Sequence, residues 1–131
     1  MGSEIKMNNA LNWFEIPAND IKRAKKFYET IFAFEMPTLD IGDGLKMALF
    51  PAESGSVGGT LIQNEEWYTP SDHKGPLVYL NANPDLDIIL NRVEVAGGKI
   101  TIPKRLITEE NGYMAVIIDS EGNRVALHSN D

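Results

Sequence analysis

The chain has 131 residues, a length that predicts one globular domain spanning residues 1–131. Its formal net charge is −7, from 12 Lys and Arg against 19 Asp and Glu. Nucleic-acid binding rests on clustered basic side chains, so this charge argues against it. The absence of cysteine excludes disulfides, thiolate metal ligands and cysteine nucleophiles. No apolar run is long enough to span a membrane. The first residues lack the apolar segment of a signal peptide, so we expect a cytoplasmic protein. Whether Met1-Gly2-Ser3 is native stays open.

The first half of the chain predicts a strand, a helix and three further strands. Residues 11–17 form an apolar-rich run that ends at Pro17, which is typical of a strand. Asn19 or Asp20 is suited to begin a helix as its N-cap. Strands are expected at about 34–40, 44–51 and 57–63, separated by glycines. The apolar stripe of the predicted helix consists of Ile21, Ala24, Phe27, Tyr28 and Ile31.

The second half repeats this order. Residues 77–82 predict a strand, Pro84 or Asp85 begins a helix, and Gly97-Gly98 ends it, because glycine accepts the left-handed conformation common at helix ends. Strands are expected near 99–107, 113–119 and 123–129, and Glu121-Gly122-Asn123 predicts the turn between the last two. The buried face of the second helix is expected to be Leu86, Ile89, Leu90, Val93 and Ala96.

The offset between corresponding positions is about 65 residues, which is the signature of an internal repeat. Glu29 falls opposite Glu94, and Asp20 falls opposite Asp85. We therefore predict an α+β fold of two βαβββ modules, roughly residues 8–66 and 74–131. Each mixed sheet is covered by one helix, and the two uncovered faces form a curved trough that suits a small ligand.

Side chains alternate between the two faces of a strand, which divides each strand into a helix-facing set and a trough-facing set. Among the trough-facing side chains, only Glu15 and His128 readily exchange protons near neutral pH, and they are the candidate acid–base pair. The alternative is that Glu15 pairs with a cation or water and His128 is an ordinary half-exposed histidine. We call the eight predicted trough-facing residues the trough residues: Trp13, Glu15, Thr60, Ile62, Leu77, Tyr79, Ala126 and His128.

Metal and cofactor binding are not expected from the residues. The chain has two histidines, and the second, His73, lies in a polar connector at residues 69–76. Catalytic metal sites usually offer three or more His, Asp, Glu or Cys ligands. Trp67 and Tyr68, just before this connector, either line a ligand or partner surface or cover the core.

Several stretches between residues 11 and 129 resemble one known family. They are Trp13–Pro17, Phe27-Tyr28, Gly58–Leu61, Val78–Asn81, Ala96–Lys99 and Asp119–Ser129. They are similar to the vicinal oxygen chelate superfamily, which includes glyoxalase I, bleomycin-resistance proteins and extradiol dioxygenases. The nearest branch is described as related to lactoylglutathione lyase.

This resemblance implies paired βαβββ modules and a homodimer. It also implies that metal-dependent relatives place their ligands at the positions of Trp13, Thr60, Leu77 and Ala126, none of which is a usual metal ligand here.

Two functions follow as hypotheses. The first is a protein that binds a small, partly aromatic molecule without a catalytic metal. Trp13 and Tyr79, with Trp67 as a further candidate, would stack on the ligand, and Glu15 would attract a cationic group. The alternative is a lyase- or isomerase-type enzyme that acts on a small carbonyl compound through Glu15 and His128, with or without a divalent metal. The sequence determines neither the ligand nor turnover nor the dimer arrangement.

Overall fold

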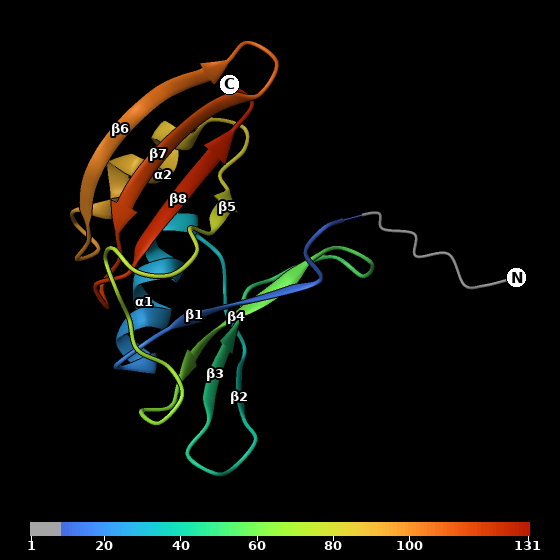
Figure 1. Ribbon diagram of the computed structural model, residues 1–131, viewed down its shortest axis with the longest axis vertical. Coiled ribbons are helices and arrows are strands. Elements are labelled where there is room, and N and C mark those ends of the chain that lie inside the picture. Colours follow the sequence, from blue (N-terminus) through green and yellow to red (C-terminus); the bar gives the residue numbers. More distant parts are fainter. Residues whose placement is uncertain (1–8) are drawn as a thin grey trace, which may run out of the picture.

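The computed structural model describes residues 9–131 (Figure 1), so Met1-Gly2-Ser3 lies outside the described residues. The elements follow in the order β1 (Trp13–Pro17), α1 (Ile21–Phe32), β2 (Thr38–Asp40), β3 (Lys46–Leu49), β4 (Gly58–Gln63), β5 (Tyr79–Asn81), α2 (Leu86–Val93), β6 (Lys99–Thr108), β7 (Gly112–Ile118) and β8 (Arg124–Ser129). None of the helices described is long and apolar enough to cross a membrane.

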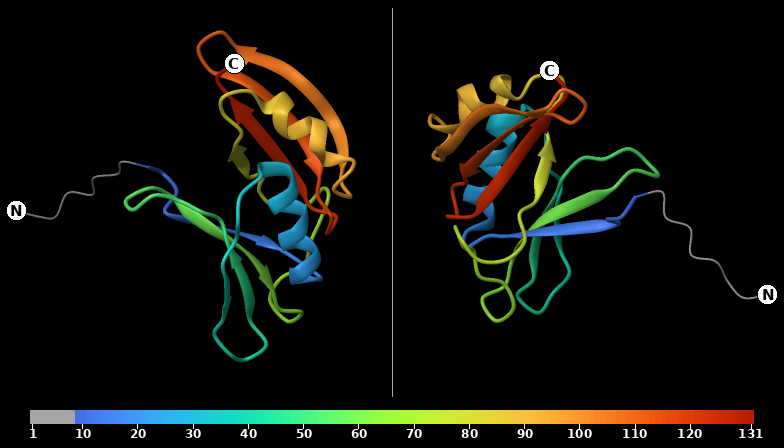
Figure 2. Two further views of the ribbon diagram at one scale, coloured as in Figure 1. Left: turned by 180° about the vertical axis from the view of Figure 1, so that it is seen from behind. Right: turned by 45° about the horizontal axis from the view of Figure 1, so that its top comes forward.

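The strands form two four-stranded sheets with the same internal order. The first sheet has the order β1-β4-β3-β2 and the second has the order β5-β8-β7-β6. In each sheet the first and last strands of the module are parallel, and the other neighbours are antiparallel. The predicted α+β fold of two βαβββ modules, each with one helix, is confirmed. The two sheets lie at opposite ends of the molecule, and α1 and α2 lie close together behind them (Figures 1 and 2).

Both helices begin and pack as their sequences predict. Asp20 is the N-cap of α1 and accepts a hydrogen bond from the backbone N–H of Arg23 at 3.1 Å. Asp85 caps α2 in the same way and accepts from the N–H of Asp87. The predicted apolar stripes are buried, apart from Ile21 and Ala96 at the margins.

Three strands are shorter than the sequence predicts: β2, β3 (Lys46–Leu49 instead of 44–51) and β5 (Tyr79–Asn81 instead of 77–82). Residues 34–40 predict a strand, but β2 contains only Thr38–Asp40. The backbone N–H of Met36 donates instead to a carboxylate oxygen of Glu29 at 2.8 Å. Phe34 stacks on Phe32 with ring centroids 5.2 Å apart. These contacts hold residues 34–36 against the end of α1, and the chain joins the sheet only from Pro37, whose carbonyl accepts from the Leu49 N–H at 2.8 Å.

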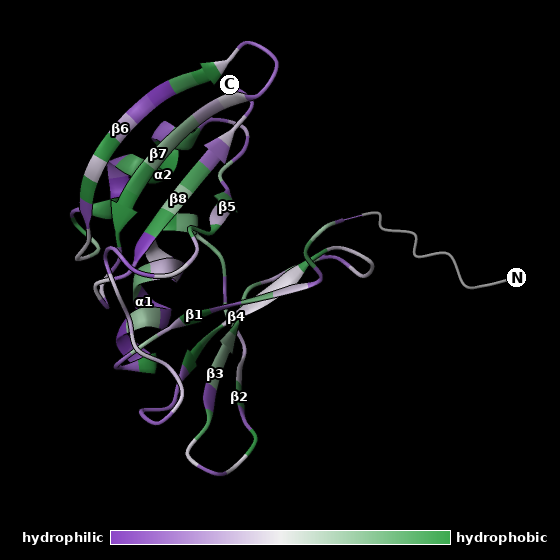
Figure 3. Cartoon of the chain, in the orientation of Figure 1, coloured by the Kyte–Doolittle hydropathy of each residue, from purple (hydrophilic) through white to green (hydrophobic). Residues whose placement is uncertain are grey.

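The two modules share one hydrophobic core. Ile16 and Leu61 of the first sheet belong to the same buried cluster as Leu80 and Leu127 of the second. Figure 3 shows the apolar residues along α2, β7 and β8, while the connecting loops are mostly polar. At one crossing point, a Cβ on Gly98 would come within 2.7 Å of the Phe27 ring, so the absence of a side chain lets α1 approach the second module.

A network of buried polar groups joins α1 to the turn between β7 and β8. The Tyr28 hydroxyl donates to Asp119 at 2.7 Å, and the Arg23 guanidinium contacts Glu121 at 2.7 Å. Glu121 also accepts hydrogen bonds from the backbone N–H groups of Asn19 and Asp20. The sequence predicts this turn correctly, but it does not reveal that the turn side chains hold the two modules together.

Burial acts differently on the two carboxylates of this network. Burial raises the pKa of Asp119, and the hydrogen bonds from Tyr28 and Asn123 only partly offset it. Burial also acts to raise the pKa of Glu121, but hydrogen bonds from Arg23, the Asp20 backbone and Ser120 outweigh it and lower that pKa. Burial, followed by the charge and hydrogen bond of Asp119, places the pKa of Tyr28 well above its ordinary value.

Candidate functional site

The strand register places the trough residues on the faces turned away from the shared core. Glu15 lies opposite Thr60 in the parallel pair β1–β4, and Tyr79 lies opposite Ala126 in the pair β5–β8. Their sequence neighbours, such as Ile16 and Leu127, point the other way into the core cluster. The core-facing residues Ile16 and Leu127 therefore lie where the alternation predicts them, whereas Thr60, Ile62 and Ala126 of the trough residues are fully buried.

These residues do not surround one common cavity within residues 9–131. Glu15 lines a cavity of about 240 Å³ between β1, the connector and the start of β8. Tyr79 lines a separate cavity of about 850 Å³. Ala126 is fully buried against Met114 and Val116, which fill the corresponding part of the second sheet.

Glu15 is held by a residue from the connecting loop. The Tyr68 hydroxyl donates to a carboxylate oxygen of Glu15 at 2.5 Å, across 53 positions of sequence. This hydrogen bond, then burial and the charge of Glu15, raise the pKa of Tyr68. The neighbouring Trp67 is 79% exposed. The loop thus contributes one residue to the surroundings of Glu15, while the other projects toward solvent.

The cavity beside Glu15 also contains two cationic side chains, Lys74 and Arg124. The connector is fastened there, because the backbone carbonyl of Ser71 accepts from the Arg124 N–H at 3.0 Å. The Asn123 side chain accepts from the Ser71 N–H at 3.3 Å. The cavity therefore combines one anionic and two cationic groups, which suits a polar ligand with hydrogen-bonding capacity at both ends.

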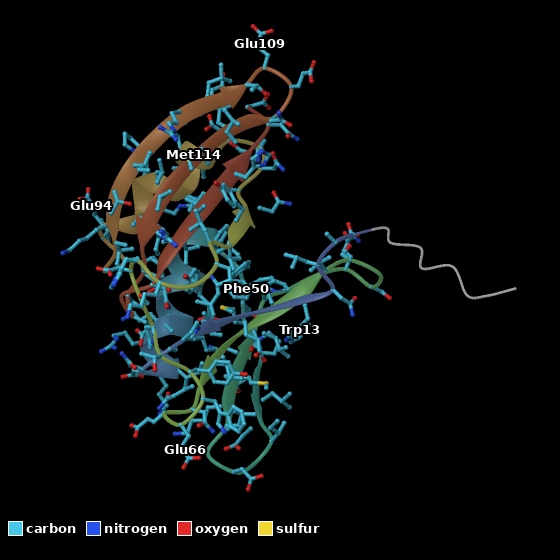
Figure 4. All side chains as sticks on the ribbon, in the orientation of Figure 1. Trp13, Phe50, Glu66, Glu94, Glu109 and Met114 are labelled. Carbon is cyan, nitrogen blue, oxygen red and sulfur yellow. The ribbon has the colours of Figure 1, made fainter. Side chains whose placement is uncertain are left out.

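His128 lies in the second sheet with a different partner. Its Nε2 is 2.6 Å from the carbonyl oxygen of Asn111 in the β6–β7 hairpin, so that nitrogen carries the proton. Glu109 marks the tip of the same hairpin in Figure 4. Among the described contacts, no hydrogen bond joins His128 to Glu15. His73 lies in the exposed connector, where its Nδ1 is 2.7 Å from an Asp72 oxygen.

Comparison with models of known protein families identifies the superfamily of the chain. Residues 10–127 match the Glyoxalase/Bleomycin resistance protein/Dioxygenase superfamily. The chain belongs to this superfamily. A comparison with curated proteins finds no match.

Solved structures of the superfamily share the fold. A glyoxalase/bleomycin resistance protein from Albidiferax ferrireducens T118 has a TM-score of 0.69 at 14% identity, over 94% of this chain and 100% of that chain. Glyoxalase I from Zea mays has a TM-score of 0.68 at 22% identity, over 92% of this chain and 46% of that chain. The hypothetical protein SA1046 from S. aureus has a TM-score of 0.63 at 16% identity, over 92% of this chain and 94% of that chain. These identities establish the shared fold only.

The strand positions that the resemblance associates with metal binding do not fit a metal ion. Trp13, Leu77 and Ala126 have no side-chain atom that binds a divalent cation. The Thr60 hydroxyl lies 2.9 Å from the carbonyl oxygen of Ala48 and 2.6 Å from that of Leu61, so it is directed at the backbone. Within residues 9–131, no group of three or more His, Cys, Asp and Glu side chains is placed to hold a metal ion.

Proposed function

We propose that this superfamily member binds a small, partly aromatic molecule on the trough-facing side of the first sheet, without a catalytic metal. The observation that carries the proposal is the side-chain chemistry of the strands. Aromatic, aliphatic and methyl groups stand at the positions of Trp13, Leu77 and Ala126, and the carboxylate of Glu15 lies on the same strand as Trp13. Such a surface can bind by stacking and by charge, but it cannot chelate.

The aromatic side chains of the trough residues are open to a ligand. Trp13 is 47% exposed and Tyr79 is 50% exposed, although both stand on strands whose alternate residues are buried. Offset or edge-to-face contact with such rings contributes about 0.5–1.5 kcal/mol beyond area burial. Glu15 attracts a cationic group, while Lys74 and Arg124 in the same cavity offer donors to a carbonyl or carboxylate.

A thermal-shift screen of metabolites and aromatic antibiotics tests this function, because a ligand stabilises the state to which it binds. For a compound that stabilises the protein, we expect Trp13→Ala and Glu15→Gln to weaken binding about tenfold, as measured by calorimetry. Trp67→Ala is the matched control, because that indole is exposed and lines none of the cavities described above. Near-stoichiometric metal by elemental analysis, with binding abolished by a chelator, contradicts the proposal.

Turnover on a small carbonyl compound is the second candidate. The observation that favours it is the contact between Tyr68 and Glu15, which places a hydroxyl donor next to a carboxylate base. In this case Glu15→Gln retains substrate affinity but loses turnover, and His128→Ala has the same effect if both residues act on one substrate. For a binding protein, no product forms from any compound that stabilises the wild type.

We also propose that two copies associate as a homodimer. Among the strands described, β1, β2, β5 and β6 each have a neighbour on one side only. Exposed aliphatic side chains lie on two of these edge strands, Leu39 on β2 and Leu106 on β6. Edge strands with exposed apolar side chains are prone to pair with another chain. Light scattering at micromolar concentration is expected to give the mass of a dimer, and a monomeric mass contradicts this arrangement.

A further inference from the structure

A second, larger cavity lies on the other side of β1 from the trough face. It has a volume of about 850 Å³, is open on one side, and is bordered by β1, the end of α1, the β3–β4 connection and β5. Phe14 and Val78 line it, and both belong to the alternating set that packs against the core. None of the residues that line this cavity carries a charge, although 24% of the chain is charged.

One wall of the cavity consists of phenylalanine rings. The ring centroids of Phe14 and Phe50 are 5.3 Å apart, and those of Phe34 and Phe50 are 6.1 Å apart. Phe32 stacks on Phe34 with an angle of 17° between the ring planes. Figure 4 shows Phe50 in the region between the two sheets. The wall is a continuous surface of phenylalanine rings, and Tyr79 is the trough residue that lines the same cavity.

Packing contacts outside the cavity hold the phenylalanine rings of this wall in place. Tyr28, which is fully buried, packs edge-on against Phe50 with ring centroids 5.4 Å apart. The ring of Phe14 rests directly on Gly59, where a Cβ would come within 2.4 Å of it. Rings held in this way lose little conformational entropy when a ligand binds, which favours affinity.

The opposite rim carries amide groups that are oriented by hydrogen bonds. The side-chain oxygen of Asn81 accepts from the backbone N–H and from the side-chain nitrogen of Asn83. The Asn83 oxygen in turn accepts from the backbone N–H of Asn130 at 2.7 Å. The rim can therefore exchange a hydrogen bond with one polar substituent, while the rest of the cavity is apolar.

We propose that this cavity, which we call the phenylalanine cavity, is a second ligand site that takes a neutral, flat aromatic molecule with one polar substituent. Its volume lies within the roughly 300–1,000 Å³ of typical small-molecule sites. A charged group would be desolvated there without a counter-charge, which disfavours ionic ligands. The site differs from the proposed trough site in that Glu15 and Trp13 line no part of it, although Tyr79 lines this cavity as well.

The neutral fluorescent probe N-phenyl-1-naphthylamine tests this site. Its fluorescence is expected to rise on binding to the intact protein, whereas an anionic anilinonaphthalene sulfonate binds at least tenfold more weakly. Val57→Trp fills the phenylalanine cavity and is expected to weaken probe binding at least tenfold. Val95→Trp is the matched control, because Val95 is 89% exposed after α2 and lines none of the cavities described.

Phe34→Leu is the second variant and keeps the experiment decisive if Val57→Trp folds poorly. It removes one ring of the wall with a small loss of volume, and we expect a three- to tenfold loss of probe affinity. Thermal melting checks that each variant is folded. Unchanged affinity in the folded variants overturns the proposal, and so does equal binding of the neutral and anionic probes.

Trp13→Ala and Glu15→Gln separate this site from the trough. Both variants are expected to leave probe affinity unchanged, even where they abolish a trough ligand. If these two variants lower probe affinity and Val57→Trp does not, the probe binds in the trough, and the proposal of a second site is wrong. If the probe is displaced as protein concentration rises and dimers form, the cavity is covered by a second copy, which also overturns the proposal.

Discussion

Tyr28 on α1 donates a hydrogen bond of 2.7 Å to Asp119, which directly follows β7, and both residues are buried. The two residues are 91 positions apart and belong to different modules. Together with the contact between Arg23 and Glu121, this bond joins the first helix to the second sheet. The cavities described above lie between elements of both modules, so their shapes depend on this junction.

Tyr28→Phe is expected to lower the free energy of unfolding at pH 7 by about 1–2 kcal/mol, because a buried carboxylate loses one donor. The loss is expected to be smaller near pH 4. The folded pKa of Asp119 is raised, so folding favours its protonated form, and stability falls as pH rises through the unfolded and then the folded pKa. Removing the Tyr28 hydroxyl raises the folded pKa of Asp119 further, so the stability of the variant decreases more steeply as the pH rises. Urea unfolding of the wild type and the variant at both pH values measures the loss of unfolding free energy. An equal loss at pH 7 and near pH 4 contradicts this prediction.

Glu121→Gln is expected to destabilise the protein by about 1–3 kcal/mol at pH 7 and by much less in acid. The folded pKa of Glu121 is lowered from its ordinary 4.5, so its contribution is present above that value and is lost as pH falls through the folded pKa. Because the Arg23 side chain is 54% exposed, its ion pair with Glu121 contributes only a small part of this loss of unfolding free energy. The difference in unfolding free energy between the two proteins should narrow as the pH falls. A constant difference across this range argues against the assignment.

Glu15→Gln is expected to lower the pKa at which one tyrosine ionises. The hydrogen bond to Glu15 is the largest cause of the raised pKa of Tyr68, and a neutral amide removes the charge that opposes phenolate formation. Absorbance titration of the phenolate measures the shift, and Tyr68→Phe identifies the band. Glu66→Gln serves as the control, because Glu66 lies two residues from Tyr68 and is exposed. A band that does not move shows that the contact is absent in solution.

Gly59→Ala is expected to cost about 1–3 kcal/mol, because its Cβ would come within 2.4 Å of the Phe14 ring, which is partly buried and packs against the core. Gly58→Ala is the control, since its nearest neighbour is the Trp13 side chain at 3.4 Å. Combining Gly59→Ala with Phe14→Leu should recover part of the loss, because the smaller side chain can move away. Chemical unfolding of the wild type, the three single variants, including Phe14→Leu alone, and the double variant checks both points. Strictly additive losses would mean that the ring and the glycine do not interact.

The sequence was sufficient for the local structure and for the side of each sheet that a residue faces. Helical and alternating periodicities depend on residues a few positions apart, so the stripe from Ala24 to Ile31 and the faces of β1 and β8 were predicted correctly. The N-caps Asp20 and Asp85, separated by the repeat offset, are equally local. The superfamily was also recognisable, because its motifs are short and continuous.

Only the tertiary structure decided which distant residues meet. Tyr68 reaches Glu15, Glu121 reaches the start of α1, and Phe50 joins Phe14 and Phe34 around the phenylalanine cavity. No periodicity encodes such contacts, because they depend on how two separately patterned modules pack through a common core. Alternation along a strand states which face a side chain occupies. What lies across from that face is set by the packing of the modules.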